Sequence, residues 1–319
     1  MNLRDGLQPL RWVTFEVVLR AEDHLRLPAY KGSVLRGAFG ATLKRLVCVM
    51  PHRNCDICLL RQQCVYAVDF ETRVNRAGSE KPAFAPHPFV LWPPAETRLD
   101  YAPGEELVFG LVLIGRAVDH LPYFIYTLEE MGKAGIGRGR GACRVEQVHA
   151  LGPDGARTPV YDGTAKQLVT GWRVATGADL DGEGDAPSVS LDFLTPTRLR
   201  VKDDLVIDLD FEALIRALLR RVSALCEHHC GGRLDLDYDG LVRRAREVRA
   251  VRRDLRWHDW ERYSARQKTT MKMGGFMGRI VFEGEMGEFY PLLRAGERLH
   301  VGKGTAFGLG MYKISGSDA

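Results

Sequence analysis

Alternating apolar and polar residues over positions 12–20 predict a β-strand as the first element. Apolar positions then recur at helical spacing over 31–47, which predicts a helix. A segment rich in aromatic residues and prolines follows at 84–94, and a continuous apolar run within 101–117 is typical of a buried strand. A second helix is expected over 120–131 and a further strand over 142–150. Strand, helix, strand, strand, helix, strand is the order of a ferredoxin-like fold.

The second half of the chain starts this pattern again. An alternating stretch at 189–199 predicts a strand, and the most regular helical periodicity of the chain follows at 211–226. Residues 274–283 read as another strand and 289–293 as a short helix. The stretch between the halves, 177–187, is acidic and rich in turn residues. We therefore place a domain boundary there.

The expected domains are residues 1–180, with a cysteine-rich insertion after the first helix, and residues 187–319. Ser33 is the expected N-cap of that first helix. The first twenty residues contain no apolar segment of the signal-peptide type, and no apolar run approaches the roughly 18 residues that a membrane span needs. We expect a cytoplasmic protein that does not insert into membranes.

Two glycine-rich runs, 132–145 and 299–314, each follow a helix-like segment and lead into a strand-like stretch. This repeated order indicates an internal duplication. The second run contains four closely spaced glycines: Gly302, Gly304, Gly308 and Gly310. Such glycines admit positive φ and the close approach of a phosphodiester backbone, or they simply form a kinked strand and turn that end a domain. The order of elements around the runs argues against a dinucleotide-binding loop. A P-loop is excluded because Gly304 follows Gly302-Lys303 and no glycine stands at position 297.

Charge is distributed unevenly along the chain. The 45 Lys and Arg against 41 Asp and Glu give a net charge of +4. Residues 241–273 hold eleven Lys and Arg against four Asp and Glu, so this strip is more positive than the whole chain. Trp257 and other aromatic residues interrupt the strip. It fits a surface that neutralises phosphates and stacks bases, or alternatively a solvated helix whose arginines pair locally.

Four cysteines lie within 17 residues, Cys48, Cys55, Cys58 and Cys64, in the spacing C-x6-C-x2-C-x5-C. Such a cluster predicts a metal site in a reducing compartment rather than a set of disulfides. Zinc or a [4Fe-4S] cluster would satisfy four thiolates, and the spacing is the same as that of the iron-sulfur loop in endonuclease III-like DNA glycosylases. With every ligand a cysteine, no coordination position stays open. We therefore interpret the metal as structural.

Several segments together resemble the CRISPR repeat-processing endoribonucleases of the RAMP superfamily. They are LDFLTPTRL at 191–199, RYSARQK at 262–268, MGGFMGRIVF at 273–282, LHVGKGTAFGLGMY at 299–312 and YKGSVLRGAFG at 30–40. The resemblance implies an α+β protein of two tandem ferredoxin-like, RRM-like domains whose glycine loops guide CRISPR repeat RNA. It also implies cleavage without a metal or other cofactor, in which the ribose 2′-hydroxyl attacks the adjacent phosphate and leaves a 2′,3′-cyclic phosphate.

The catalytic candidates under this resemblance are histidine, tyrosine and lysine side chains. Many relatives have a histidine after the GAFG segment, where this chain has Ala41. We therefore select His300 as the titrating group, Tyr30 and Lys31 opposite it, and His24 in reserve. The RNA-binding candidates are Lys303, Gly302, Gly304, Gly308, Gly310, Arg36, Arg138, Arg140, Arg256, Trp257, Arg262, Arg266 and Lys268.

Two other functions fit parts of the sequence. Because Ala41 replaces the family's histidine, the chain could be a non-catalytic RNA-binding subunit of a CRISPR ribonucleoprotein, with other effector subunits as partners. The cysteine spacing alone would suit an iron-sulfur protein that processes DNA. The sequence leaves open whether the protein is a monomer or a dimer.

Overall fold

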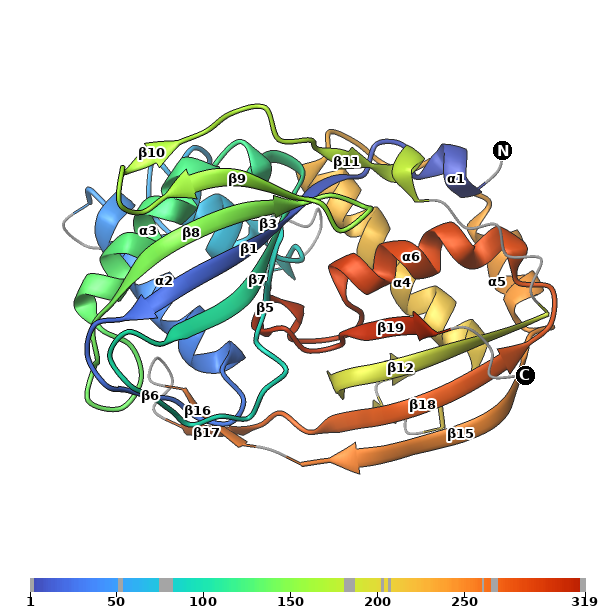
Figure 1. Cartoon of the computed structure of the whole chain (residues 1–319). Helices are drawn as coiled ribbons and strands as arrows, with labels where there is room; N and C mark the ends of the chain where they lie inside the picture. The colour runs from blue at the N-terminus through green and yellow to red at the C-terminus, as the bar shows by residue number, and fades with distance from the viewer. Residues whose placement is uncertain are drawn as a thin grey trace. The chain divides into compact units, whose positions relative to one another are not determined.

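A computed structural model describes residues 3–50, 54–74, 83–180, 187–201, 204–205, 208–259, 261–264 and 269–315 (Figure 1). The chain divides into two compact units. The N-terminal unit is Trp12–Ala175 with His228–Cys230, and the C-terminal unit is Met1–Arg11, Thr176–Glu227 and Gly231–Ala319. Arg262 lies in a described strand whose side chains are not described, and Arg266 and Lys268 lie outside the described residues.

The N-terminal unit is built on a seven-stranded sheet within the described residues, in the order β10-β9-β8-β1-β7-β5, with β11 also paired to β1. Its strands are β1 (Arg11–Ala21), β5 (Phe89–Trp92), β7 (Glu106–Ile114), β8 (Cys143–Leu151), β9 (Arg157–Asp162), β10 (Gln167–Leu168) and β11 (Ala175–Thr176). The alternating strand predicted first is the centre of the sheet. It runs antiparallel to both neighbours, so that Phe15 lies opposite Leu111 on β7 and Ala150 on β8.

Helices α2 (Gly32–Val47) and α3 (Leu121–Ala134) pack side by side on one face of this sheet (Figure 1). Their contact is aromatic: the rings of Phe39 and Phe124 stack with centroids 5.1 Å apart, and Phe89 of β5 meets Phe124 edge-on at 5.8 Å. All three rings are buried. The helical spacing seen in the sequence therefore places its apolar face on the sheet, where removal from water stabilises the unit.

A six-residue π-helix, η1 (Tyr66–Glu71), packs against α2. Gly40 makes this contact possible, because a Cβ atom there would lie 1.9 Å from Cζ of Phe70. The Arg36 guanidinium lies over the same ring, 4.1 Å from its centroid. The glycine that weakens α2 as an isolated helix thus admits a neighbouring aromatic side chain.

The C-terminal unit has a four-stranded sheet in the order β15-β18-β12-β19. Its main elements are β12 (Ser188–Thr197), β15 (Arg249–His258), β18 (Gly275–Glu283), β19 (Tyr312–Ser315), α4 (Phe211–His229), α5 (Tyr238–Ala245) and α6 (Tyr290–Leu299). Figure 1 shows α4 and α6 on one face of this sheet. Phe211, the first residue of α4, connects this helix to the sheet and to α6. Its ring centroid lies 5.1 Å from that of Phe282 on β18 and 5.3 Å from that of Phe289, just before α6. The carboxylate of Asp210 caps α4 by accepting from the amide of Ala213 at 2.6 Å.

The remaining elements are short. They are α1 (Leu3–Gly6), β2 (Leu25–Arg26), β3 (Arg73–Val74), β4 (Ala83–Phe84), β6 (Asp100–Tyr101), β13 (Arg200–Val201), β14 (Asp204–Leu205), β16 (Glu261–Ser264), β17 (Thr269–Lys272), η2 (Gly115–Val118), η3 (Gly177–Asp179), η4 (Gly287–Phe289) and η5 (Thr305–Phe307). In the part of the chain that the structure describes, no helix combines the length and apolarity that crossing a membrane requires.

The predicted fold class is confirmed. The orders β8-β1-β7-β5 and β19-β12-β18-β15 are the same ferredoxin-like order, with the last strand of each motif beside the first. One detail of the prediction is wrong: Ser33 does not cap α2, which begins at Gly32 after Lys31. The alternative interpretation of the cationic strip as a helix does not hold for residues 249–258, which form the strand β15. Cations on this exposed strand protect its open edge against pairing with another chain.

Candidate functional site

The glycine loop after α6 is closed and shaped by its glycines. Gly302, Gly304, Gly308 and Gly310 all have positive φ, between 75° and 85°. Its two ends are joined by the amide of Val301, which donates to the carbonyl of Gly310 at 2.9 Å. A Cβ atom at Gly310 would lie 1.8 Å from the carbonyl oxygen of Val301. A side chain at 310 would therefore disrupt this closure, and the positive φ at all four positions explains why the run is rich in glycine.

The loop after α3 repeats this arrangement. Gly135, Gly137 and Gly139 have positive φ, and the amide of Ile136 donates to the carbonyl of Gly141 at 2.9 Å. The strand that follows each loop, β8 or β19, pairs with the first strand of its own sheet. The structure thus contains helix, glycine loop and strand twice, as the sequence indicated. Exposed cations lie on both loops: Arg138, Arg140 and Lys303.

His300 lies in the core of the C-terminal unit. Its side chain is 0 % exposed, and Nδ1 is 3.1 Å from the carbonyl oxygen of Leu309. Burial, aided by the nearby Arg221 guanidinium, lowers the pKa of His300 to about 3. Arg221 is itself buried and donates from Nε to the carbonyl of Leu299 at 2.8 Å, at the end of α6. This placement does not support the catalytic role expected for His300. The imidazole instead fixes the glycine loop to the end of the helix.

Lys31 is held inside the N-terminal unit, and Tyr30 before it is half-buried. Lys31 is 0 % exposed, and its Nζ donates to the carbonyl of Glu96 at 3.0 Å, with the Tyr101 ring centroid 5.8 Å away. Burial lowers the pKa of Lys31 and raises the pKa of Tyr30 far above its ordinary value. A phenol with so high a pKa stays protonated, and a buried lysine bound to a carbonyl is poorly placed to exchange protons with a ligand.

His24 has an exposed side chain beside the first glycine loop. The imidazole is 49 % exposed, with Nδ1 3.9 Å from the carboxylate of Asp100. The carbonyl oxygen of His24 would lie 2.6 Å from a Cβ atom at Gly141, so the backbone of His24 touches the loop. Among the four catalytic candidates, His24 has the placement most compatible with contact to a ligand.

The cationic strip is partly neutralised by its own unit. Four of its arginines face carboxylates within 3.0 Å: Arg244 with Glu288, Arg246 with Glu212, Arg252 with Asp254 and Arg253 with Asp208. Arg256 is exposed, and Trp257 is half-buried with its indole N–H on Asp259 at 2.7 Å. The strip therefore carries less available charge than its composition suggests.

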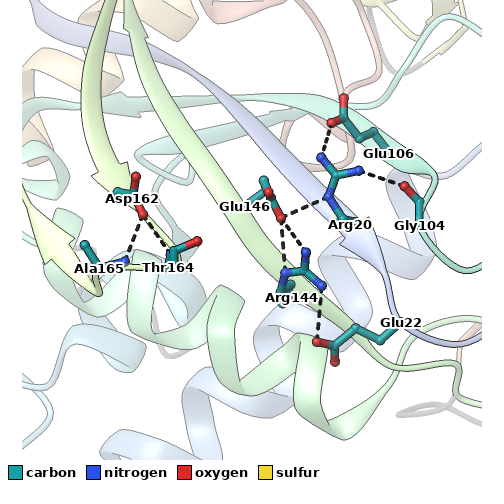
Figure 2. Close-up of polar contacts among 9 residues, drawn as sticks. All are labelled: Arg20, Glu22, Gly104, Glu106, Arg144, Glu146, Asp162, Thr164 and Ala165. Carbon is teal, nitrogen blue, oxygen red and sulfur yellow. Dashed lines mark hydrogen bonds and ion pairs between the residues drawn. The ribbon is translucent and has the colours of Figure 1, made fainter.

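Arginines on the sheet of the N-terminal unit are neutralised in the same way, as Figure 2 shows. Arg20 of β1 lies 2.7 Å from Glu106 of β7 and 3.0 Å from Glu146 of β8. Arg144 lies 3.0 Å from Glu146 and 3.7 Å from Glu22. Each of these cations already has two carboxylates, so this surface offers little excess charge to a polyanion.

The four clustered cysteines line one pocket. Cys48 follows the end of α2, Cys64 precedes η1, and Cys55 and Cys58 come from the loop between them. Burial raises the pKa of the Cys55 thiol, while Lys44 opposes this shift and Cys64 and Cys48 are near enough to add to it. Among the described residues, no three His, Cys, Asp or Glu side chains are arranged to hold a metal ion. The four thiols share a pocket, but their positions do not form a coordination shell.

One titratable pair was not anticipated from the sequence. The Nδ1 atom of His120, before α3, lies 2.7 Å from a carboxylate oxygen of Asp69 in η1. The two residues are 51 positions apart, and a π-helical turn leaves no periodic signal that could have indicated their contact.

Comparison with known proteins agrees with the fold of each unit. Residues 10–172, more than half of the chain, match a family of N-terminal domains, AF_1859_N. Residues 191–312 match the family of the CRISPR-associated endoribonuclease Cas6. An uncharacterized protein of Archaeoglobus fulgidus is 25% identical over 290 residues, covering 90% of this chain and 92% of that protein.

Solved structures of Cas6 share the fold. Thermus thermophilus Cas6 superimposes with a TM-score of 0.56 at 16% identity, covering 96% of this chain and 99% of that chain. A Cas6 product complex gives 0.57 at 18% identity, covering 95% and 99%. A partial Cas6-RT-Cas1–Cas2 complex gives 0.57 at 13% identity, covering 97% of this chain and 46% of that chain.

Two ferredoxin-like units, each with a glycine loop before its last strand, make up the fold that this chain shares with the solved Cas6 structures. The chain belongs to the AF_1859_N family, and its residues 191–312 match the family of the CRISPR-associated endoribonuclease Cas6.

Proposed function

We propose that this protein is an endoribonuclease that cleaves CRISPR precursor RNA within its repeats. The observation that carries this proposal is the match of residues 191–312 to the Cas6 endoribonuclease family. The matched residues include β12, β18 and the glycine loop after α6, so the likeness covers the loop as well as the sheet. The related Cas6 whose structure is a product complex supports the same substrate class.

The reaction we propose needs no metal ion. The ribose 2′-hydroxyl attacks the adjacent phosphorus, the bond to the 5′-oxygen breaks, and the products are a 2′,3′-cyclic phosphate and a 5′-hydroxyl end. Such a step requires a route for the 2′-hydroxyl proton, a proton for the departing oxygen and positive charge beside the phosphorane. The exposed Arg138, Arg140 and Lys303 of the glycine loops are the cations proposed to contact phosphates along the bound repeat, not the phosphorane itself.

The test uses RNA transcribed from the repeat of the same genome, incubated with purified protein in EDTA. The expected 5′-fragment ends in a 2′,3′-cyclic phosphate, so RNA ligase cannot join labelled pCp to its 3′ end until the phosphate has been removed enzymatically. The expected 3′-fragment begins with a 5′-hydroxyl, which polynucleotide kinase labels directly. The matched control is the same RNA with a 2′-deoxy nucleotide upstream of the cut, which should stay intact. Cleavage that requires Mg²⁺, or that proceeds on the deoxy substrate, would contradict the mechanism.

A second candidate is a non-catalytic RNA-binding subunit of a CRISPR ribonucleoprotein. Ala41 on the exposed side of α2, together with the buried positions of His300 and Lys31, favours it. Stoichiometric retention of uncut repeat RNA, with or without Mg²⁺, would identify this function.

We also propose that Cys48, Cys55, Cys58 and Cys64 bind a structural zinc ion or a [4Fe-4S] cluster. Their shared pocket supports this, because four thiols converge there from segments on both sides of a short loop. A bound metal would anchor that loop between α2 and η1, and no step of the reaction depends on it.

A further inference from the structure

Asp69 and His120 form a hydrogen-bonded pair in which Asp69 is buried and His120 is partly exposed to solvent. The Asp69 side chain is 0 % exposed, whereas that of His120 is 26 % exposed. Asp69 Oδ2 accepts the hydrogen bond from Nδ1 of His120 at 2.7 Å. This bond fixes the tautomer and direction of the imidazole, as the carboxylate of a catalytic triad does for its histidine.

The geometry leaves Nε2 of His120 as the outward-facing nitrogen. Nδ1 points to the buried carboxylate, and within the described residues Nε2 is not among the buried side-chain atoms that lack a partner. The other oxygen of Asp69, Oδ1, is buried and has no hydrogen-bond partner there. The negative charge of Asp69 is therefore directed mainly at one imidazole, whose cationic form it stabilises.

Some of the groups around His120 raise its pKa and others lower it. The hydrogen bond to Asp69 raises the pKa of His120 most strongly, burial lowers it, Arg116 of η2 lowers it and Asp119 raises it. The net direction is upward. His120 thus holds its proton at a higher pH than an ordinary histidine, while the Arg116 cation, on an exposed residue, lies close enough to affect it.

Exposed aromatic rings continue from this histidine along α3. The Tyr123 ring meets His120 edge-on with centroids 6.3 Å apart and is 49 % exposed, and Tyr126 is 57 % exposed. Large aromatic side chains usually bury their rings, and exposed ones can stack unpaired bases. A proton donor, a cation and stacking surfaces therefore come from one short part of the N-terminal unit.

We propose that His120 is the general acid of the RNA cleavage, with Asp69 as its positioning residue. This inference rests on the proposed function. As the 2′-oxygen bonds to phosphorus and loses its proton to a solvent base, the bond from phosphorus to the 5′-oxygen breaks. His120 Nε2–H gives its proton to that departing oxygen, and the neutral imidazole is reprotonated from water. The π-helical turn that carries Asp69 has the role often found for such turns, which is to direct a side chain at a functional site.

The decisive experiment compares two leaving groups under single-turnover conditions in EDTA. With ordinary repeat RNA, His120→Ala should cut about 10²–10⁴-fold more slowly than the wild type, the usual contribution of a general acid. With the same RNA carrying a sulfur in place of the bridging 5′-oxygen, the thiolate leaves without a proton, so the variant should cut nearly as fast as the wild type. His228→Ala removes a histidine from the same unit and should leave both rates unchanged.

Each result separates the inference from the function on which it rests. If His120→Ala slows both substrates equally, or neither, His120 is not the general acid although the endoribonuclease stands. If the wild-type protein cuts neither RNA, the proposed function itself fails, and with it the general acid.

Asp69→Asn tests the positioning role. A general acid works when protonated, so the rate should fall as pH rises through the pKa of His120, and this fall should begin at lower pH in Asp69→Asn. Imidazole NMR titration without RNA should show the same downward shift of the His120 pKa. An unchanged pKa in a folded Asp69→Asn protein would overturn the role of Asp69, and circular dichroism identifies a variant that has not folded.

Discussion

Gly135 and His300 adopt the same unusual backbone conformation at the same place in the two units. Each is the residue after the last turn of a helix, with φ 79° and ψ 146° at Gly135 after α3 and φ 60° and ψ 169° at His300 after α6. This region is readily accessible only to glycine, and it costs other residues about 1–3 kcal/mol. His300 is held there by its buried imidazole and its hydrogen bond to Leu309. The histidine that the sequence suggested as a catalyst is the counterpart of a helix-terminating glycine.

Two substitutions at His300 should separate backbone strain from side-chain contacts. Both His300→Ala and His300→Gly lose the imidazole, but only glycine relaxes at φ 60°. We expect both variants to be less stable than the wild type, and His300→Gly to be more stable than His300→Ala by about 1 kcal/mol, since the relieved strain exceeds the extra chain entropy of glycine. Urea unfolding at pH 7 measures the difference, and an alanine variant as stable as the glycine variant would show that the strain is absent.

The depressed pKa of His300 makes the C-terminal unit sensitive to acid. Its pKa is about 3 in the folded protein and near 6.5 in the unfolded chain. Below about pH 6.5 the unfolded state therefore binds a proton that the folded state rejects, and stability falls by up to about 1.4 kcal/mol per pH unit until the folded pKa is reached. Urea unfolding from pH 7.5 to pH 5 should accordingly cost the wild type more stability than His300→Gln. Equal losses in the two proteins would contradict the burial of a neutral His300.

Gly310→Ala should damage the closed loop, whereas Gly139→Ala should be mild. Both glycines have positive φ, but a Cβ atom at Gly310 would lie 1.8 Å from the carbonyl oxygen of Val301 while Gly139 has open space around it. The alanine at 139 meets only the φ penalty of about 1 kcal/mol, and the one at 310 adds a backbone displacement for a total of about 2–4 kcal/mol. Thermal unfolding of both variants provides the comparison. A loss of stability no larger at 310 than at 139 would mean that the loop is open.

Removing the loop cations should lower RNA affinity and its dependence on salt. Arg138→Ala and Arg140→Ala each delete an exposed cation, and for single-stranded RNA each lost phosphate contact should reduce the slope of log K against log salt by about 0.7. Arg144→Ala removes the same charge from a side chain already facing Glu146 and Glu22, so it is the matched control and should leave the slope unchanged. Filter binding of repeat RNA at several salt concentrations gives these slopes, and equal effects of all three variants would argue against contact at the loop.

The cysteine pocket should contain metal in protein purified without chelators. Elemental analysis is expected to give about one zinc, or about four irons with a brown absorbance band near 400 nm. Cys58→Ser should abolish the metal, whereas Cys230→Ser, outside the cluster, should retain it. Metal-free wild-type protein that unfolds at the same temperature as the freshly purified protein would refute a structural site.

The elements predicted best are those in which apolar residues repeat with the spacing of a strand or a helix and are the residues buried in the core. The alternating residues 12–20 became the central strand β1, and the apolar stripe at 211–226 became most of α4. The glycine loops were also predictable, since closely spaced glycines imply positive φ and close backbone contact. Such local patterns predict the structure correctly because the side chains that produce the apolar spacing are the ones that pack in the core.

The roles of the titratable residues could not be predicted in the same way. His300 follows a polar helix end and precedes a glycine run, which in sequence suggests exposure, but the loop folds back and buries it against Leu309. His120 contacts Asp69, a partner 51 residues away in the sequence. Whether a single polar side chain is buried and which group it bonds to depend on tertiary contacts. The periodicity of apolar residues in the sequence gives no information about these contacts.

The two glycine loops take their shape from cross-loop hydrogen bonds within each unit, Ile136 to Gly141 and Val301 to Gly310, before any ligand arrives. When a ligand binds a loop that is already ordered, little of the binding free energy is lost to ordering the loop backbone. Such a loop should bind its partner in a preformed conformation. Substitutions that disorder the loop should therefore weaken the complex even when every contacting side chain is retained.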